Sequence, residues 1–423
     1  MGRATAVAMR ARVAPCLVIA GAVVLAAVTG CTAIPAARGH PGSPEITAGR
    51  QPPQTASNSN RWRVIYSTPT VQTELTGIAS IRATDAWVVG YHGYPQAVPI
   101  LLHWNGEDWR TARLPAVPGF RPSQVMASIA GNVWIDGTTA GGNGELFRFD
   151  GRSWQRMPVP AGRWGSNLAA VTGRTNAWLT SGGCKRRSWP WNCSSTIEQW
   201  NGTRWIASHL RILVSGLAAV GRQIWVTGLT GTRPAHGGDG SGHLVLLRQA
   251  TSGWQPIAAP HAAVTASPRV IVTGTELPQL AAGSNGTAWI LCATPGGKTS
   301  QGNLFHWNSA PRNRARWTAI PVPVKVGRRP LYVSTNLSPD GRIGVWAGAD
   351  AHWTGLQWVS ASIVRPTRLG AVQLIEAAGI RVEPGSWAIG ASGVSIVTVP
   401  GGPGVIAVNG PLYRASCRRR PCG

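Results

Sequence analysis

The chain has 423 residues and carries 40 Lys and Arg against 15 Asp and Glu, which gives a formal net charge of +25. So few carboxylates disfavour glycoside hydrolysis by paired acids. The excess of cations favours attraction to anionic polymers or surfaces.

The N-terminus has the features of an export signal. Three arginines precede an apolar run over residues 13–29, which is too short for a membrane-spanning helix. The run ends in Val28-Thr29-Gly30-Cys31, which resembles a bacterial lipobox. That resemblance implies a lipoprotein signal peptide over residues 1–30 and lipidation of Cys31, with the protein anchored on the extracytoplasmic face of the cell membrane. An ordinary secretory peptide is the alternative.

Residues 31–60 comprise the lipidated Cys31 and a tether. The segment after Cys31 is rich in Pro, Gly, Ala, Ser and Gln and has no hydrophobic periodicity. This composition predicts a disordered connection to the globular part of the chain.

A Trp-centred pattern then recurs seven times, each copy a small or apolar residue followed by Trp and a short β-type run. The spacing between successive copies averages about 50 residues, which indicates a repeated small sheet. The seven tryptophans are Trp87, Trp134, Trp178, Trp225, Trp289, Trp346 and Trp387.

A second pattern follows in most repeats: an apolar strand, a tight turn and another Trp. Its clearest copies are Trp104-Asn105-Gly106 with Trp109 and Trp200-Asn201-Gly202 with Trp205. Asn-Gly provides the positive φ that tight hairpins need, so the two flanking tryptophans are expected to meet across a strand pair. Each repeat therefore has four strands, the first at 76–81, 86–90, 100–104 and 109–114, as in a β-propeller.

The ends of the repeat region predict how the fold is completed. The seventh repeat has no Trp-bearing outer strand, whereas residues 61–67, with Trp62, match such a strand. We therefore expect an all-β, seven-bladed propeller of four-stranded antiparallel blades over residues 61–413. The N-terminal strand at 61–67 closes it and removes exposed sheet edges.

The cysteines agree with an exported protein. Cys184 and Cys193 bracket one loop, and Cys417 and Cys422 bracket an Arg-rich stretch in the basic tail at 414–423. Both pairs are predicted disulfides. Cys292 follows Trp289 in a predicted strand and is expected to be a buried free thiol. The spacings lack the partner histidines of a zinc site, so no metal is expected.

The phrases Asp85-Ala86-Trp87-Val88-Val89-Gly90 and His103-Trp104-Asn105-Gly106-Glu107-Asp108-Trp109 resemble repeats of exported actinobacterial proteins. Those repeats are described as kelch-like or sialidase-like propellers. The resemblance covers residues 61–413 and implies the fold; it implies no particular activity. His103, His306 and His352 each precede a Trp at one repeat position, so we interpret them as structural.

Loops between second and third strands and between blades share one face of a propeller, where ligands usually bind. The Cys-bracketed loop combines cations with flat aromatics, which suits sugars or anionic polymers. The predicted ligand-binding residues are Lys185, Arg186, Arg187, Trp189 and Trp191, with Tyr91, His92, Arg163 and Trp164 on the same face.

No catalytic motif or cofactor site is recognisable, and Asp136 and Asp239 form only a loosely placed acid pair. The sequence therefore favours a membrane-anchored binding or scaffold module for a protein or an anionic cell-wall glycan, with no nucleic-acid partner. The alternatives are a carbohydrate hydrolase or lyase on a propeller scaffold, and a sensor or assembly factor beside a membrane complex.

Overall fold

A computed structural model of the chain describes β-strands between Arg61 and Asn409, all within the compact unit Gly49–Gly423. The structure does not describe residues 1–60 and 410–423, nor several short internal segments. The longer internal segments that it does not describe are 161–166, 185–192, 232–240, 266–277, 294–299, 309–315, 364–371, 380–385 and 393–403. The predicted signal peptide, the tether and the 414–423 tail therefore lie outside it. Within the described residues, no helix has the length and apolarity to cross a membrane.

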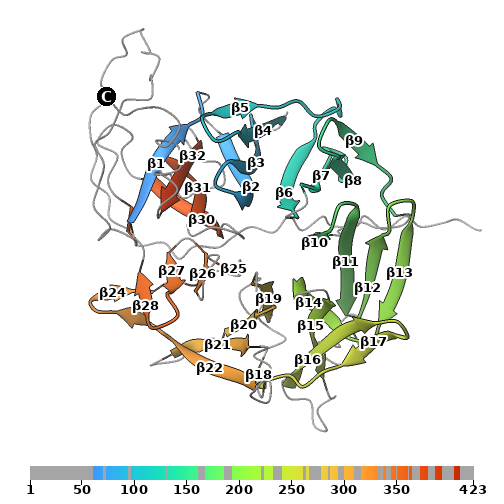
Figure 1. The fold of residues 1–423 in the computed structure, drawn as a ribbon, viewed down its shortest axis with the longest axis vertical. Coiled ribbons are helices and arrows are strands. Elements are labelled where there is room, and N and C mark those ends of the chain that lie inside the picture. Colours follow the sequence, from blue (N-terminus) through green and yellow to red (C-terminus); the bar gives the residue numbers. More distant parts are fainter. Residues whose placement is uncertain are drawn as a thin grey trace, which may run out of the picture. The chain divides into compact units, whose positions relative to one another are not determined.

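Six sheets are each built from four consecutive antiparallel strands and form the blades of a β-propeller (Figure 1). Blade 1 contains β2 (Thr73–Arg82), β3 (Asp85–His92), β4 (Val98–Trp104) and β5 (Trp109–Thr111); blade 2 contains β6 (Arg121–Ala127), β7 (Val133–Thr138), β8 (Gly144–Phe149) and β9 (Trp154–Met157). Blade 3 contains β10 (Asn167–Thr172), β11 (Asn176–Cys184), β12 (Cys193–Trp200) and β13 (Trp205–Leu210); blade 4 contains β14 (Leu213–Val220), β15 (Gln223–Gly231), β16 (Ser241–Ala250) and β17 (Gly253–Pro256). Blade 5 contains β19 (Gln279–Ala282), β20 (Ala288–Ala293), β21 (Ser300–Asn308) and β22 (Arg316–Pro323); blade 6 contains β25 (Leu337–Pro339), β26 (Val345–Ala347), β27 (Ala351–Trp353) and β28 (Trp358–Ser360).

Two additions depart from the four-strand repeat. The short strand β18 (Ala263–Thr265) pairs with β16. Between blades 5 and 6, β23 (Lys325–Val326) and β24 (Arg329–Pro330) pair only with each other and form a small hairpin. Neither was expected from the sequence, because neither contains the Trp marker of the repeat.

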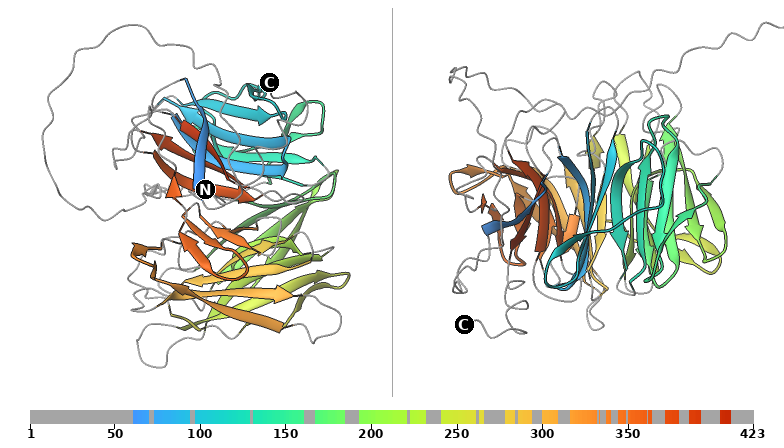
Figure 2. Two further views of the ribbon diagram at one scale, coloured as in Figure 1. Left: turned by 60° about the vertical axis from the view of Figure 1, so that its left-hand side comes forward. Right: turned by 90° about the horizontal axis from the view of Figure 1, so that it is seen from above.

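The expectation of seven blades is corrected to six, counted as sheets of four consecutive strands. After blade 6 and the short β29 (Ser362–Ile363), the described chain supplies only three more strands, β30 (Val372–Gly379), β31 (Ser386–Ser392) and β32 (Gly404–Asn409). These three share a sheet with β1 (Arg61–Ser67), which pairs antiparallel with β32 and parallel with β29. The blue β1 therefore lies beside the red strands from the end of the chain (Figures 1 and 2). We call this the terminal sheet.

The predicted turns between third and fourth strands are present and share one chemistry. In blade 1 the side chain of Asn105 accepts hydrogen bonds from the backbone N–H groups of Glu107 and Asp108, and Gly106 has a φ of 99°. Asp150, Asn201 and Thr354 accept the same pair of bonds in blades 2, 3 and 6. Short polar side chains at this position replace the missing backbone partners of the turn.

The tryptophans that flank these turns meet across the strand pair, as predicted. Trp104 and Trp109 are register partners, and their ring centroids are 5.7 Å apart. The corresponding separations are 5.4 Å for Trp200 and Trp205 and 5.8 Å for Trp353 and Trp358. Such tilted aromatic pairs stabilise a sheet beyond the area that they bury.

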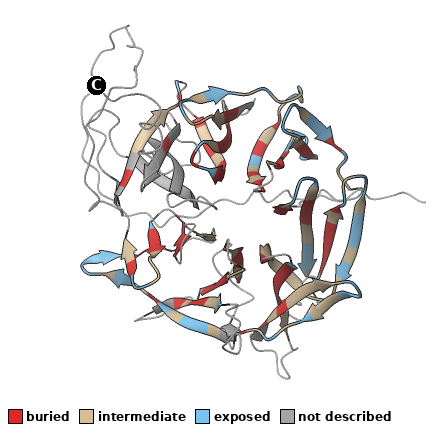
Figure 3. Ribbon diagram, viewed as in Figure 1, coloured by how far each residue is buried: buried red, intermediate tan, exposed pale blue. Residues whose placement is uncertain are grey.

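A second tryptophan contact joins neighbouring blades. The second-strand Trp of one blade packs against the fourth-strand Trp of the next, with centroid separations of 5.4 Å for Trp87 and Trp154 and 6.0 Å for Trp134 and Trp205. The same relation holds between blades 3 and 4 and between blades 4 and 5. The inner strands are mostly buried and the outer strands carry most of the exposed residues (Figure 3), so the core lies between blades.

Glycines allow close approach of first and second strands. A Cβ on Gly90 would lie 2.1 Å from the carbonyl oxygen of Glu74, and one on Gly137 would lie 2.2 Å from that of Arg121. Only glycine leaves room for another backbone at such positions. Packing therefore requires glycine at the third position after the second-strand Trp in these two blades.

Strand directions define two faces of the propeller. The turns between third and fourth strands lie on one side, here called the turn face. The connections between second and third strands, and from one blade to the next, lie on the opposite side, the loop face. Because β1 runs antiparallel to β32, its first residue, Arg61, lies on the turn face.

Candidate functional site

Most of the predicted ligand-binding residues cannot be placed. Lys185, Arg186, Arg187, Trp189, Trp191, Arg163 and Trp164 lie outside the described residues, as do Cys31, Cys417 and Cys422. Tyr91 and His92 are described at the end of β3, on the loop face, where both are partly buried. The hydroxyl of Tyr91 donates a hydrogen bond to the carboxylate of Glu74, its register partner on β2. Tyr91 is therefore held by its own blade.

Cys184 and Cys193 lie at the loop-face ends of β11 and β12, where they are direct partners in the antiparallel register. Directly opposed residues have Cα atoms about 4.5–5.5 Å apart, within the range that a disulfide spans. The two ends of the loop that they bracket are therefore neighbours on paired strands. Cys292, by contrast, is a buried free cysteine, as predicted, and burial raises the pKa of its thiol to about 12.

The histidines at one repeat position have the structural role that the sequence predicted. His103, His306 and His352 each stack on the second-strand Trp opposite them in the register, with ring centroids 3.9–4.1 Å apart. His103 also contacts the carboxylate of Asp85, with Nε2 and Oδ1 3.1 Å apart. Among the described residues, no group of three His, Cys, Asp or Glu side chains could hold a metal ion.

Three described carboxylates at turns and strand ends have structural partners. Asp85 contacts His103, Asp108 accepts a hydrogen bond from Arg110, and Asp150 caps its turn. The hydrogen bonds that its carboxylate accepts from the backbone N–H groups of Ser153 and Arg152 lower the pKa of Asp150. These acids therefore support turns and strand pairs.

Asp136 differs because it is a buried carboxylate between two blades. Its Oδ2 accepts a hydrogen bond of 2.7 Å from the backbone N–H of Leu168 in blade 3, whereas Oδ1 has no hydrogen-bond partner. Desolvation raises its pKa from 3.8 to about 7, although the hydrogen bond from Leu168 acts in the opposite direction. Its proposed partner Asp239 lies outside the described residues.

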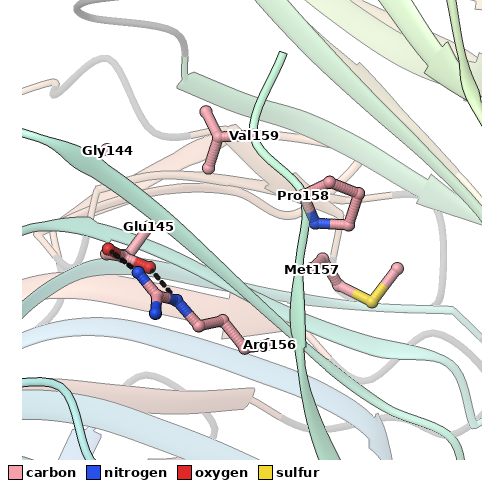
Figure 4. Close-up of a pocket in the computed structure, with 6 residues that line it drawn as sticks. All are labelled: Gly144, Glu145, Arg156, Met157, Pro158 and Val159. Carbon is pink, nitrogen blue, oxygen red and sulfur yellow. Dashed lines mark hydrogen bonds and ion pairs between the residues drawn. The ribbon is translucent and has the colours of Figure 1, made fainter. Parts of the chain in front are cut away.

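A pocket of about 400 Å³ opens at the loop-face end of the outer strands of blade 2. Glu145 on β8 is almost fully buried there and accepts two hydrogen bonds from the guanidinium of Arg156 on β9, at 2.7 Å and 2.6 Å (Figure 4). The Arg156 side chain remains 58% exposed, and Gly144, Met157, Pro158 and Val159 form the rest of the wall. The ion pair fixes the direction of an exposed guanidinium at the edge of the loop face.

Several other exposed cations of the loop face were not predicted from the sequence, because they lie at the ends of fourth strands or in the connections between blades. Arg113 follows β5, Arg211 follows β13, and the β23–β24 hairpin carries Lys325, Arg328 and Arg329. All five are exposed. Together with Arg156 they form what we call the basic rim.

No family model and no curated protein matches this chain. Solved structures similar to it include "YCF48 bound to D1 peptide", at 15% identity and a TM-score of 0.47, with 84% of this chain and 96% of that chain covered. Another is YCF48 from Cyanidioschyzon merolae, at 15% identity and a TM-score of 0.44, with 83% and 99% covered. A third is SapL1 lectin in complex with alpha methyl fucoside, at 15% identity and a TM-score of 0.34, with 70% and 98% covered. Similarity this low carries no argument about function.

Proposed function

We propose that this chain is a membrane-anchored, extracytoplasmic binding protein, in which a rigid propeller presents a basic loop face to a protein or an anionic cell-wall glycan. The observation that carries the proposal is the contrast between acids and cations. Described carboxylates such as Asp85, Asp108, Glu145 and Asp150 are engaged in turns and strand pairs, while exposed cations remain on the loop face. Such a surface suits binding of anions rather than acid–base catalysis.

The proposal includes closure of the ring by the terminal sheet, in which β1 takes the place of a fourth strand. Two contacts support it. Trp62 on β1 packs against Trp346 of blade 6 with a centroid separation of 4.8 Å, the same relation that joins the other blades. Tyr66 at the other end of β1 packs against Trp109 of blade 1. One strand from the start of the chain thus contacts the blades on both sides.

A disulfide between Cys184 and Cys193 is also part of the proposal. Their direct register pairing supports it, and an exported location would allow it to form. Closure of so short a loop would stabilise the fold by about 2–3 kcal/mol in the chain-entropy picture. It would restrict the intervening loop, with its predicted ligand residues Lys185 to Trp191, to the loop face.

Anchoring through a lipid on Cys31 completes the proposal, and the lipobox-like sequence Val28-Thr29-Gly30-Cys31 supports it. Mass spectrometry of the mature N-terminus tests this part directly. A diacylated Cys31 as the first residue is expected. An N-terminus elsewhere, or an unmodified Cys31, would refute the anchor.

Binding is tested by affinity capture with the full lipidated chain from its own membranes, in parallel with incubation on purified cell-wall glycans. We expect saturable binding of a protein or a glycan with no shortening of the glycan. Product release from a glycan would refute the proposed function and would favour the hydrolase or lyase. A Cys31→Ala chain is the matched control, because it keeps the propeller and loses the proposed anchor.

A further inference from the structure

The cations of the propeller are distributed asymmetrically between its two faces. On the turn face, exposed cations alternate with exposed acids, among them Glu107, Asp108 and Asp150. On the loop face, the acids nearest the rim are engaged: Glu145 is buried against Arg156, and Glu74 accepts a hydrogen bond from Tyr91. Among the described acids of that face, only Asp350, in the β26–β27 connection, is exposed. Among the described residues, the exposed cations of the basic rim therefore outnumber the exposed acids of their face by a wider margin than the exposed cations of the turn face do.

The β23–β24 hairpin is the most concentrated part of this rim. Val326 pairs with Arg329, and Gly327, with a φ of 60°, occupies the first position of the tight turn between them. The base is fixed because Leu331 is fully buried in the core of blades 5 and 6 and its N–H donates to the carbonyl oxygen of Val324. Lys325, Arg328 and Arg329 are exposed on this rigid support. The hairpin lies at the outer edge of the ring, where β24 is labelled in Figure 1. Because the hairpin backbone is already held in place, binding there would cost little conformational entropy apart from that of the three cationic side chains.

The charge and placement of the basic rim indicate what kind of ligand it fits. The described chain enters the propeller at Arg61, on the turn face, so the rim lies on the opposite face. From the positive charge of the rim and its spread over several blades we infer that it binds an anionic polysaccharide of the cell wall, one that carries phosphodiester or carboxylate groups along its length. This inference rests on the proposed function and assigns it a surface and a ligand class.

Spacing of the cations fits a polymer better than a small anion. The rim residues follow different blades: Arg113 follows blade 1, Arg156 ends blade 2, Arg211 follows blade 3, and the hairpin precedes blade 6. Charges distributed along an edge in this way attract repeated charges on one chain, and each contact adds to the others because the polymer is already bound. The attraction between exposed charges weakens as salt shortens the Debye length.

The test measures binding of the full chain in a non-ionic detergent to poly(glycerol phosphate), to neutral dextran and to phosphatidylglycerol vesicles, at low and at high salt. The rim variant is Lys325→Gln/Arg328→Gln/Arg329→Gln. The matched control is Arg152→Gln/Arg174→Gln/Arg204→Gln, which removes the same charge from exposed turn-face positions. Thermal unfolding of both variants checks that the fold is retained.

We expect salt-sensitive binding of poly(glycerol phosphate), no binding of dextran, and roughly tenfold weaker binding by the rim variant only. Equal loss in both variants would overturn the inference, because net charge alone would then explain binding. Binding of vesicles without the polymer would also overturn it and would identify the lipid surface as the ligand. Failure with every probe would overturn the inference but not the proposed function, provided that the chain still captures a protein partner. Shortening of the polymer would instead refute the proposed function.

Discussion

Asp136 provides the sharpest test of how the blades are held together, because a single buried carboxylate connects blade 2 to the backbone of Leu168 in blade 3. Its pKa is raised from the ordinary value of 3.8 to about 7 by burial. Between these two values the folded state binds more protons than the unfolded state. The contribution of this group to stability is therefore greatest below pH 4, falls as the pH rises toward 7, and stays low at higher pH.

The size of this contribution to the free energy of unfolding follows from the shift in the pKa of Asp136. A rise from 3.8 to about 7 corresponds to about 4 kcal/mol lost on ionisation of Asp136 in the folded state. Asp136→Asn keeps the shape and an acceptor for Leu168 and removes this cost. The new amide N–H₂ would occupy the place of Oδ1, which has no partner, at a cost of about 1–2 kcal/mol. We expect the variant to be about 2–3 kcal/mol more stable than the wild-type chain at pH 8.

The assay is urea unfolding of both proteins at intervals from pH 4 to pH 8.5, with the difference between them taken at each pH so that other titrations cancel. Asp150→Asn is the control, because Asn fills the equivalent turn position at Asn105 and Asn201. The pKa of Asp150 is lowered, so its contribution is present at neutral pH and lost on acidification, the opposite sign. Parallel pH profiles of wild type and Asp136→Asn would refute the reasoning, because the carboxylate would then not titrate at a raised pKa.

Three further outcomes are expected. Trp62→Ala should lower the free energy of unfolding by about 3–5 kcal/mol in urea and promote self-association through the uncovered edge of β32, seen by size-exclusion chromatography. Leu356→Ala, at an 85% exposed site, should change neither property, and a Trp62→Ala variant as stable as the wild type would contradict closure by β1. Gly90→Ala should destabilise by about 2 kcal/mol or more through a clash with the Glu74 carbonyl, whereas Gly183→Ala, with open space around it, should be tolerated in the same unfolding assay. Cys184→Ser should lower the free energy of unfolding by about 2–3 kcal/mol, as should a reductant on the wild-type chain; an unchanged value in both cases would rule out the disulfide with Cys193.

The repeated features of the fold were predictable from the sequence because each depends on residues close together in the chain. Trp104, the turn at Asn105 and Gly106, and Trp109 lie within six positions, and the structure pairs them as expected. The stacking of His103 on Trp87 was likewise indicated by a recurring position. Local turn chemistry and period-two alternation are the signals that survive in a single sequence.

Contacts between blades were not predictable in this way. The bond from Leu168 to Asp136 joins residues 32 positions apart, and Asp136 occupies a place that Val89 fills in blade 1. Nothing in the local pattern distinguishes the two. The β23–β24 hairpin was missed for a related reason, since only Leu331 at its base and the partly buried Val326 connect it to the core. The ligand-binding role predicted for the loop at Lys185–Trp191 stays untested, because these residues lie outside the described part of the chain.

The two faces of the propeller differ in how much freedom the fold leaves them. On the turn face, the turns of blades 1, 2, 3 and 6 each supply a side-chain acceptor such as Asn105 or Asp150 and a following glycine, and each brings two aromatics together. On the loop face, the strands end in connections of unequal length, and one of them contains an entire extra hairpin. Charge can accumulate there without loss of turn geometry or core packing. The basic rim lies on the face where sequence changes disturb the scaffold least, and this is the physical reason to look for binding there rather than along the tryptophan-lined turns.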